Sequence, residues 1–172
     1  IWERPLASLV AQGATLGDVD GDGALEVVVV TASGAVHVLR GRDGKEAFFF
    51  RTHGRVMAPA LITQLSPSLV AAPGAPQRQH VVVVSFDGFL YVVDGETRCV
   101  DVVDIGETSY SMPLADDVDG NGRMDVVLAT MNGVVYAFES PAPYDPMAAW
   151  PSQAQGRNGF VARAGGGGGA AL

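Results

Sequence analysis

Apolar residues along this chain gather in short β-branched runs and not at helical spacing. Residues 27–30 and 126–128 are such runs, and comparable runs recur along the sequence. Dipeptides that contain glycine separate many of them, as is typical of turns between strands. The pattern therefore predicts an all-β chain and no convincing helix.

Three segments share one strand–turn–strand pattern, which is the clearest internal repeat. Each consists of an apolar run, a dipeptide that ends in glycine, and a second apolar run. The three copies are residues 30–39 with Ser33-Gly34, residues 84–93 with Asp87-Gly88, and residues 129–138 with Asn132-Gly133. Such dipeptides favour two-residue turns of the primed types, whose twist matches that of a β-hairpin. We expect three hairpins.

The similarity extends to both sides of the hairpins. A short strand is expected before each one, and a further turn and strand are expected after the first two, at residues 46–50 and 99–105. A unit of about four strands in roughly 45 to 54 residues has the size of a β-propeller blade. The expected fold is three four-stranded antiparallel blades, and the expected boundaries are residues 1–52, 53–106 and 107–161.

Three blades are fewer than the four to eight of a typical propeller. The partial propeller at residues 1–161 is therefore expected to belong to a larger propeller. Its remaining blades either lie outside these residues of the same protein or are supplied by other chains. The Gly- and Ala-rich residues 162–172 are expected to form a flexible tail.

Two acidic nonapeptides, residues 18–26 and 117–125, each run into an apolar strand. Oxygen-bearing side chains stand at loop positions 1, 3, 5 and 9, and position 7 offers its backbone carbonyl. Ca²⁺ takes six to eight oxygen ligands at about 2.3 to 2.6 Å. The sequence thus predicts two Ca²⁺ sites. Their candidate ligands are Asp18, Asp20, Asp22, Ala24 (carbonyl) and Glu26, and Asp117, Asp119, Asn121, Arg123 (carbonyl) and Asp125.

Acidic loops of this kind have two other interpretations. A helix–loop–helix calcium site needs an acid at loop position 12, where this chain has Val29 and Leu128. A solvated Asp-Gly turn without a metal is the simpler alternative. The recurrence of the whole nonapeptide before the same kind of strand favours the metal.

The middle unit departs from the pattern. Where the acidic loop would lie, residues 64–79 form a Pro-, Ser-, Ala- and Gln-rich stretch without a carboxylate. This stretch predicts a surface insertion on an intact blade that has lost its metal site.

Composition narrows the functional classes. The chain has 172 residues, 48% of them hydrophobic, and a net charge of −8. It is long enough to bury a core, and its charge argues against binding nucleic acid or an anionic membrane surface. No apolar run is long enough to cross a bilayer, and no signal peptide is recognisable. The single cysteine, Cys99, is expected to be a buried, inert thiol within a strand.

The nonapeptide before a Val-rich strand, in blades of this length, resembles the FG-GAP repeats of integrin-α-type propellers. The resemblance covers roughly residues 12–140, and it implies Ca²⁺ sites on one face of the propeller. The middle blade departs from it, and so does Glu26, where the family usually has aspartate. The matching residues are Asp18, Asp20, Asp22, Glu26, Asp117, Asp119, Asn121 and Asp125.

The end of the chain carries a narrower resemblance. Residues 140–146, Trp150 and residues 155–158 look like the closing segment of the plant and algal "defective in exine formation" proteins. That likeness implies a membrane-associated protein of the secretory pathway or cell surface, with a role in cell-wall patterning. The segment from Trp150 also resembles closing strands of quinoprotein-like propellers. From its residues alone, Trp150 is expected to pack against the blades.

No catalytic constellation is recognisable. His37, His53 and His80 lack the spacing of a zinc site. The adjacent pair Asp116 and Asp117 is expected to point to opposite faces of a strand. The sequence therefore favours a non-enzymatic interaction scaffold, which is extracellular, at the cell surface or in the secretory pathway. Its expected partners are the remaining propeller blades or another protein, including a cell-wall or cell-surface ligand. The alternative is a propeller domain of an enzyme such as a quinone-dependent dehydrogenase or a polysaccharide lyase.

Overall fold

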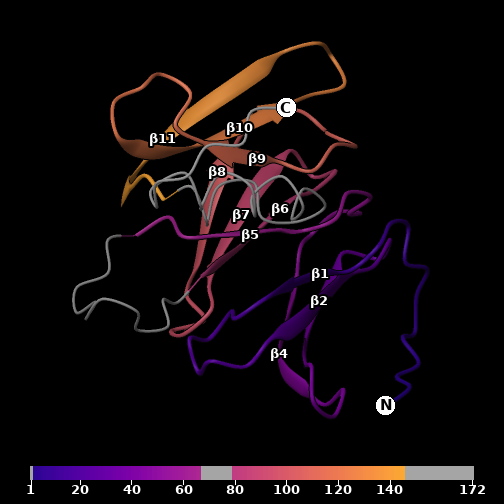
Figure 1. Cartoon of the computed structure of the whole chain (residues 1–172). Helices are drawn as coiled ribbons and strands as arrows, with labels where there is room; N and C mark the ends of the chain where they lie inside the picture. Colours follow the sequence, from indigo (N-terminus) through magenta and orange to yellow (C-terminus); the bar gives the residue numbers. More distant parts are fainter. Residues whose placement is uncertain (1, 67–78, 146–172) are drawn as a thin grey trace, which may run out of the picture.

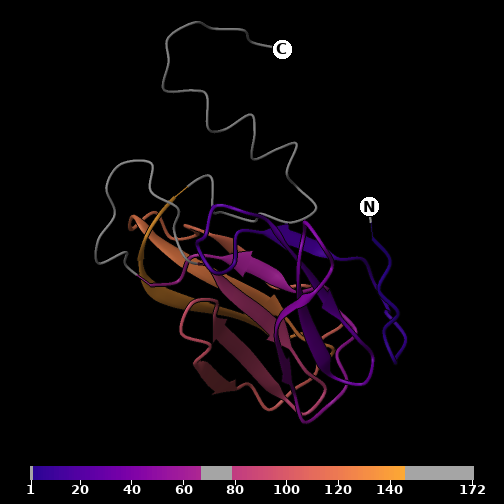
Figure 2. The ribbon, with the colours of Figure 1, turned by 90° about the horizontal axis from the view of Figure 1, so that it is seen from below.

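The computed structural model describes residues 2–66 and 79–145, and within these ranges the chain is built from strands and loops. The strands form three antiparallel sheets that follow one another in chain order across the molecule (Figures 1 and 2). In the described ranges no helix is long and apolar enough to span a membrane.

Each sheet is a meander in which neighbours in sequence are neighbours in space. The first sheet contains β1 (Thr15–Gly17), β2 (Glu26–Val30), β3 (Ala35–Arg40) and β4 (Glu46–Arg51). The second contains β5 (Leu61–Thr63), β6 (His80–Val84), β7 (Phe89–Asp94) and β8 (Val100–Asp104). The third contains β9 (Leu114–Asp116), β10 (Arg123–Ala129) and β11 (Val135–Pro143).

The second sheet lies between the other two and packs against both. One apolar cluster joins Val28 and Val36 of the first sheet to Val81 and Tyr91 of the second. Another cluster joins the opposite face of the second sheet to the third, and includes Leu61, Val84, Met124 and Leu128. Because both faces of the second sheet are covered, β6 is buried along its whole length, which explains its continuous run of valines.

The three expected hairpins are present, but their turns are not of the primed types. The N–H of Gly34 donates to the carbonyl of Thr31 at 2.9 Å, and Gly34 has φ 82°. Ser33, the other residue of the expected pair, does not have positive φ. A type I′ turn needs positive φ at both central residues, and serine disfavours positive φ. The chain instead uses a three-residue loop that ends in a glycine with left-handed φ. Gly88 and Gly133 repeat this arrangement, with φ 88° and 84°.

The N-terminal residues 2–14 lie along the outer strands of the first sheet. The indole Nε1 of Trp2 donates to the Gly41 carbonyl at 2.8 Å, and Arg4 pairs with Glu46 at 3.8 Å. Farther along, the Leu9 carbonyl accepts the N–H of Ala32 at 2.7 Å. This segment therefore runs across the face of the first sheet that points away from the second.

The predicted position of Cys99 is wrong. Cys99 is exposed and precedes β8 instead of lying inside it. Since β8 is the edge strand of the second sheet, it is mostly exposed, and the valines around Cys99 do not mark a core position. Residues 67–78 and 146–172 lie outside the described residues. They contain most of the expected insertion, the expected fourth strand of the third unit, Trp150 and the expected tail.

Candidate metal centre

The first acidic loop connects β1 to β2 and folds around the side chain of Asp18. Asp18 Oδ1 accepts the N–H of Gly21 at 2.9 Å, and Oδ2 accepts the N–H of Gly23 at 3.0 Å. Both glycines have positive φ, 77° and 86°, which L side chains rarely adopt. The glycines thus let the loop bend back on its first carboxylate.

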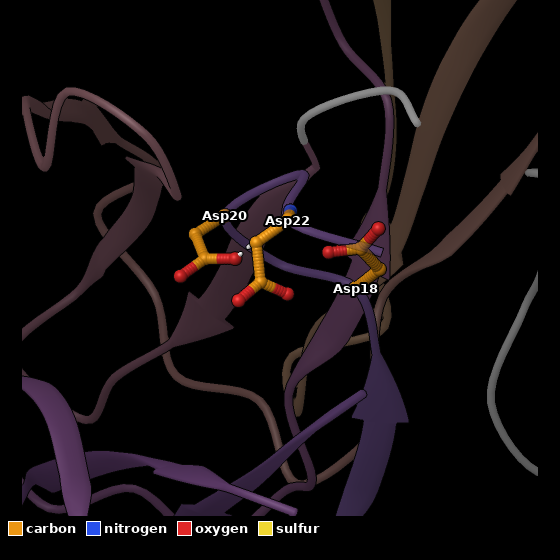
Figure 3. Close-up of side chains that lie close together, drawn as sticks. All are labelled: Asp18, Asp20 and Asp22. Carbon is orange, nitrogen blue, oxygen red and sulfur yellow. Dashed lines mark hydrogen bonds between the residues drawn. The ribbon is translucent and has the colours of Figure 1, made fainter. Parts of the chain in front are cut away.

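Asp20 and Asp22 shape the rest of the loop through short side-chain-to-backbone bonds. Asp20 Oδ1 accepts the N–H of Asp22 at 3.2 Å, and Asp22 Oδ1 accepts the N–H of Ala24 at 2.7 Å. Figure 3 shows the carboxylates of Asp18, Asp20 and Asp22 gathered together. One oxygen atom from each lies within 4.8 Å of the other two.

The second acidic loop, between β9 and β10, repeats this network almost atom for atom. The two oxygens of Asp117 accept the N–H groups of Gly120 and Gly122 at 2.8 and 3.0 Å. Asp119 Oδ1 accepts the N–H of Asn121 at 3.0 Å, and Asn121 Oδ1 accepts the N–H of Arg123 at 2.8 Å. The two loops share one local structure as well as one sequence pattern.

The ninth residue of each loop is a buried acid that closes the loop on its second residue. Glu26 is 2% exposed, and its Oε2 accepts the N–H of Val19 at 2.9 Å. Asp125 is 3% exposed, and its Oδ2 accepts the N–H of Val118 at 3.0 Å. The valine at loop position 2, which recurs in both copies, was not recognised from sequence as part of this bridge.

The environment of Glu26 raises the pKa of its carboxyl group above the usual value. Burial raises the pKa of Glu26, and the nearby carboxylates of Asp20, Asp22 and Asp18 raise it further. The hydrogen bond from the Val19 N–H acts in the opposite direction and does not outweigh them.

The two loops differ in how the ninth residue takes part in the oxygen cluster. Asp125 supplies an oxygen within 4.8 Å of those of Asp117 and Asp119. In the first loop the corresponding group consists of Asp18, Asp20 and Asp22, without Glu26. Asn121 occupies the position of Asp22, so an amide oxygen replaces a carboxylate there. Each loop therefore brings three carboxylates together. They come from loop positions 1, 3 and 5 in the first loop and from positions 1, 3 and 9 in the second.

The donor chemistry of both loops fits a hard divalent cation. The candidate side chains offer oxygen atoms only, which suits Ca²⁺ and not a metal that prefers nitrogen or sulfur. Carboxylates this close repel one another, so a bound cation would lower the energy of the loop. Of the ligands predicted from sequence, the carboxylates that converge are those of Asp18, Asp20 and Asp22 in the first loop and of Asp117, Asp119 and Asp125 in the second. The side chain of Arg123 pairs with Glu139 at 2.7 Å, so the ligand predicted at this position is its backbone carbonyl and not its side chain.

The histidines lie apart and each has a local partner. His37 Nδ1 contacts Glu46 Oε1 at 2.8 Å, and His53 Nδ1 contacts the Tyr91 hydroxyl at 3.1 Å. His80 Nδ1 accepts the N–H of Leu65 at 3.2 Å. Among residues 2–66 and 79–145, the clusters of three or more potential metal ligands contain no histidine or cysteine.

The geometry and the comparisons together define the fold as a β-propeller. Antiparallel meander sheets that pack face to face in chain order are propeller blades. The solved structure of BamB from Moraxella catarrhalis is similar to this chain, with a TM-score of 0.56 and 20% sequence identity. The match covers 83% of this chain and 38% of that one, so this chain spans well under half of the neighbour's length. No family model matches the sequence, and no curated protein matches it.

Proposed function

We propose that this chain is a Ca²⁺-binding, FG-GAP/integrin-α-like propeller module that acts as a non-enzymatic interaction scaffold. The observation that carries the proposal is the convergence of three carboxylates, within 4.8 Å of one another, in each of two loops. The shared network of backbone hydrogen bonds around Asp18 and Asp117 supports it, because that network orients the carboxylates without help from the rest of the protein.

In this proposal calcium stabilises the scaffold and takes no part in chemistry. Each loop joins the first two strands of a blade, so a cation held there would restrict the loop and fix the ends of those strands. Extracellular Ca²⁺ modules bind at about 10⁻⁴ to 10⁻³ M. Sites of that affinity fill outside the cell, which is consistent with the extracellular, cell-surface or secretory-pathway location proposed from the resemblance. A propeller is typical of interaction scaffolds, and the proposed ligand is a protein or cell-wall component.

Calorimetric titration with Ca²⁺ tests the proposal directly. The wild-type chain should show two saturable sites, and Asp20→Asn and Asp119→Asn should each remove one. Asp101→Asn is a matched control, because it removes the same charge from an exposed position on β8 outside both loops. Two sites should remain in that control. The absence of saturable binding up to about 10 mM, well above the range for extracellular modules, or equal losses in all three variants, would contradict the proposal.

A further inference from the structure

A cleft of about 300 Å³ lies on the outer side of the first sheet, between β3, β4 and the N-terminal segment. β3 contributes Ala35 and His37 to its lining, and β4 contributes Phe49 and Arg51. Ala35 pairs with Arg51 and His37 pairs with Phe49, so the four side chains lie on the same side of the sheet. We call this space the outer cleft. Its volume is at the lower end of the range for small-molecule sites, about 300 to 1,000 Å³.

The outer cleft carries a cation without an anionic partner. Arg51 is exposed, and its guanidinium carbon lies 6.0 Å from the centroid of the Phe49 ring. Within residues 2–66 and 79–145 no carboxylate pairs with Arg51, whereas Arg4, Arg40 and Arg123 each pair with one. A guanidinium binds a carboxylate through two parallel hydrogen bonds. In a chain of net charge −8, Arg51 is therefore a local site for a carboxylate ligand.

The other polar groups of the outer cleft are hydroxyls and one imidazole. Ser8 of the N-terminal segment lines the cleft, and so do Thr31 and Ser33, whose hydroxyl oxygens lie 3.0 Å apart. His37 Nδ1 lies 2.8 Å from Glu46 Oε1. Because a carboxylate oxygen accepts, Nδ1 donates to it, which leaves Nε2 of the neutral ring as an acceptor. The cleft thus offers both donors and an acceptor to a ligand with several hydroxyl groups.

Phe49 gives the outer cleft an exposed aromatic surface. Its ring is 45% exposed, and its centroid lies 5.1 Å from that of His37. Phe48, the preceding residue, points to the other side of the sheet and belongs to the cluster between the first two sheets. Phe49 takes no part in that cluster. Its ring is therefore available to pack against the C–H groups on one face of a pyranose ring.

We propose that the outer cleft binds one hexuronate unit of an acidic polysaccharide. Arg51 holds the carboxylate, and Phe49 packs against a C–H face of the sugar ring. The sugar hydroxyls bond to His37 Nε2 and to the hydroxyls of Ser8 and Ser33. The proposal names a ligand class for the scaffold proposed above; it rests on that scaffold role and not on calcium.

Two other anionic ligands fit the outer cleft less well. An inorganic anion would use Arg51 and leave the Phe49 ring and the hydroxyls without a role. An acidic peptide supplies carboxylates, but its side chains offer neither a flat face of C–H groups nor a set of neighbouring hydroxyls. A hexuronate has all three features in one ring, and the cleft has a counterpart for each.

A sugar titration followed by NMR tests the proposal on the 172-residue chain. The two ligands are an α-1,4-linked galacturonate trimer and the neutral galactose trimer of the same linkage. All samples contain EDTA, so calcium cannot bridge sugar and protein. The acidic trimer should saturate with a dissociation constant of about 1 mM or lower, as expected for one well-placed sugar unit. It should move the resonances of His37 and Phe49, and the neutral trimer should bind about tenfold more weakly or worse.

Variants of exposed residues separate the contacts without disturbing the core. Arg51→Gln should weaken binding of the acidic trimer about tenfold or more. Arg51→Lys keeps the charge but not the two parallel hydrogen bonds, and its affinity should be intermediate. Phe49→Leu should weaken binding about threefold. Arg55→Gln is the matched control, because it removes the same charge from an exposed position outside the cleft; it should change the affinity less than about twofold.

Four results would overturn the proposal. They are no saturable binding up to about 10 mM, ten times the expected constant; equal affinity for the neutral trimer; equal losses in Arg51→Gln and Arg55→Gln; and displacement of the trimer by equal concentrations of acetate or of a tri-aspartate peptide. The calcium titration described above is independent of this experiment. Two intact calcium sites without sugar binding would therefore reject the hexuronate and leave the calcium-binding scaffold in place.

Discussion

The Oε2 atom of Glu26 accepts a hydrogen bond from the backbone N–H of Val19 at 2.9 Å. The Val19 side chain is fully buried in the cluster between the first and second sheets. The carboxyl group that closes the acidic loop is therefore hydrogen-bonded to a residue whose side chain lies in the interface between two blades. This link explains how a surface loop can influence the packing of the scaffold.

Glu26→Ala should destabilise the protein more than Glu26→Gln does. Both variants remove the same negative charge, but only glutamine keeps an oxygen that can accept the Val19 N–H. Leaving that buried donor unsatisfied costs about 1 to 3 kcal/mol. Urea unfolding in EDTA should show a difference of this size between the two variants. Equal stabilities would mean that the hydrogen bond contributes nothing.

Gly95→Ala should weaken the contact between the first two blades. A Cβ atom at Gly95 would lie 1.9 Å from the backbone carbonyl oxygen of Val19, a contact that only movement of the backbone can relieve. We expect a loss of about 2 kcal/mol or more in the free energy of unfolding. Gly13→Ala is the control, since a Cβ there meets nothing within 4 Å. A neutral Gly95→Ala would argue against this close approach.

Chelation should lower the stability of the protein. At 10 mM Ca²⁺ and dissociation constants of about 10⁻⁴ to 10⁻³ M, each site would contribute about 1.4 to 2.7 kcal/mol. For a chain of this size, that corresponds to a fall in melting temperature of about 3 to 10 °C per site when EDTA replaces calcium. Asp20→Asn should remove about half of the difference. An unchanged melting temperature would refute a structural role for calcium.

Tyr91→Phe should lower the stability of the protein at neutral pH. It should also make the fall in stability at alkaline pH smaller than in the wild-type protein. The Tyr91 hydroxyl donates to Asp87 Oδ2 at 2.7 Å, and losing this bond costs about 1 kcal/mol. Burial, and then the hydrogen bond to Asp87, raises the pKa of Tyr91 above its usual 10.0. Its folded-state pKa exceeds the unfolded value, so this contribution to stability is full below pH 10 and is lost as the pH rises through the folded pKa.

Melting temperatures between pH 8 and pH 11 measure this effect. The wild-type protein should lose more stability above pH 10 than Tyr91→Phe does. Parallel curves for the two proteins would show that ionisation of Tyr91 is not coupled to folding.

Local features of this protein were predictable from sequence because they depend on neighbours in the chain. The strands follow from β-branched runs, and the blade repeat follows from their spacing. The acidic loops could also be recognised, since Asp18 and Asp117 bond to N–H groups only three to five residues away. The predicted primed turn type was wrong, because Ser33, Asp87 and Asn132 precede glycine in primed turns and in three-residue loops alike.

The sequence alone was insufficient to predict which residues are buried. Cys99 stands among valines, yet it is exposed, because it precedes a strand at the edge of its sheet. Val19 and Val118 lie in the same tetrapeptide and make the same backbone bond to the closing acid. One is 0% exposed and the other 55% exposed. The local sequence determined the loop and its hydrogen bonds, whereas the tertiary structure decided the burial, because burial depends on whether another sheet packs against that side of the blade.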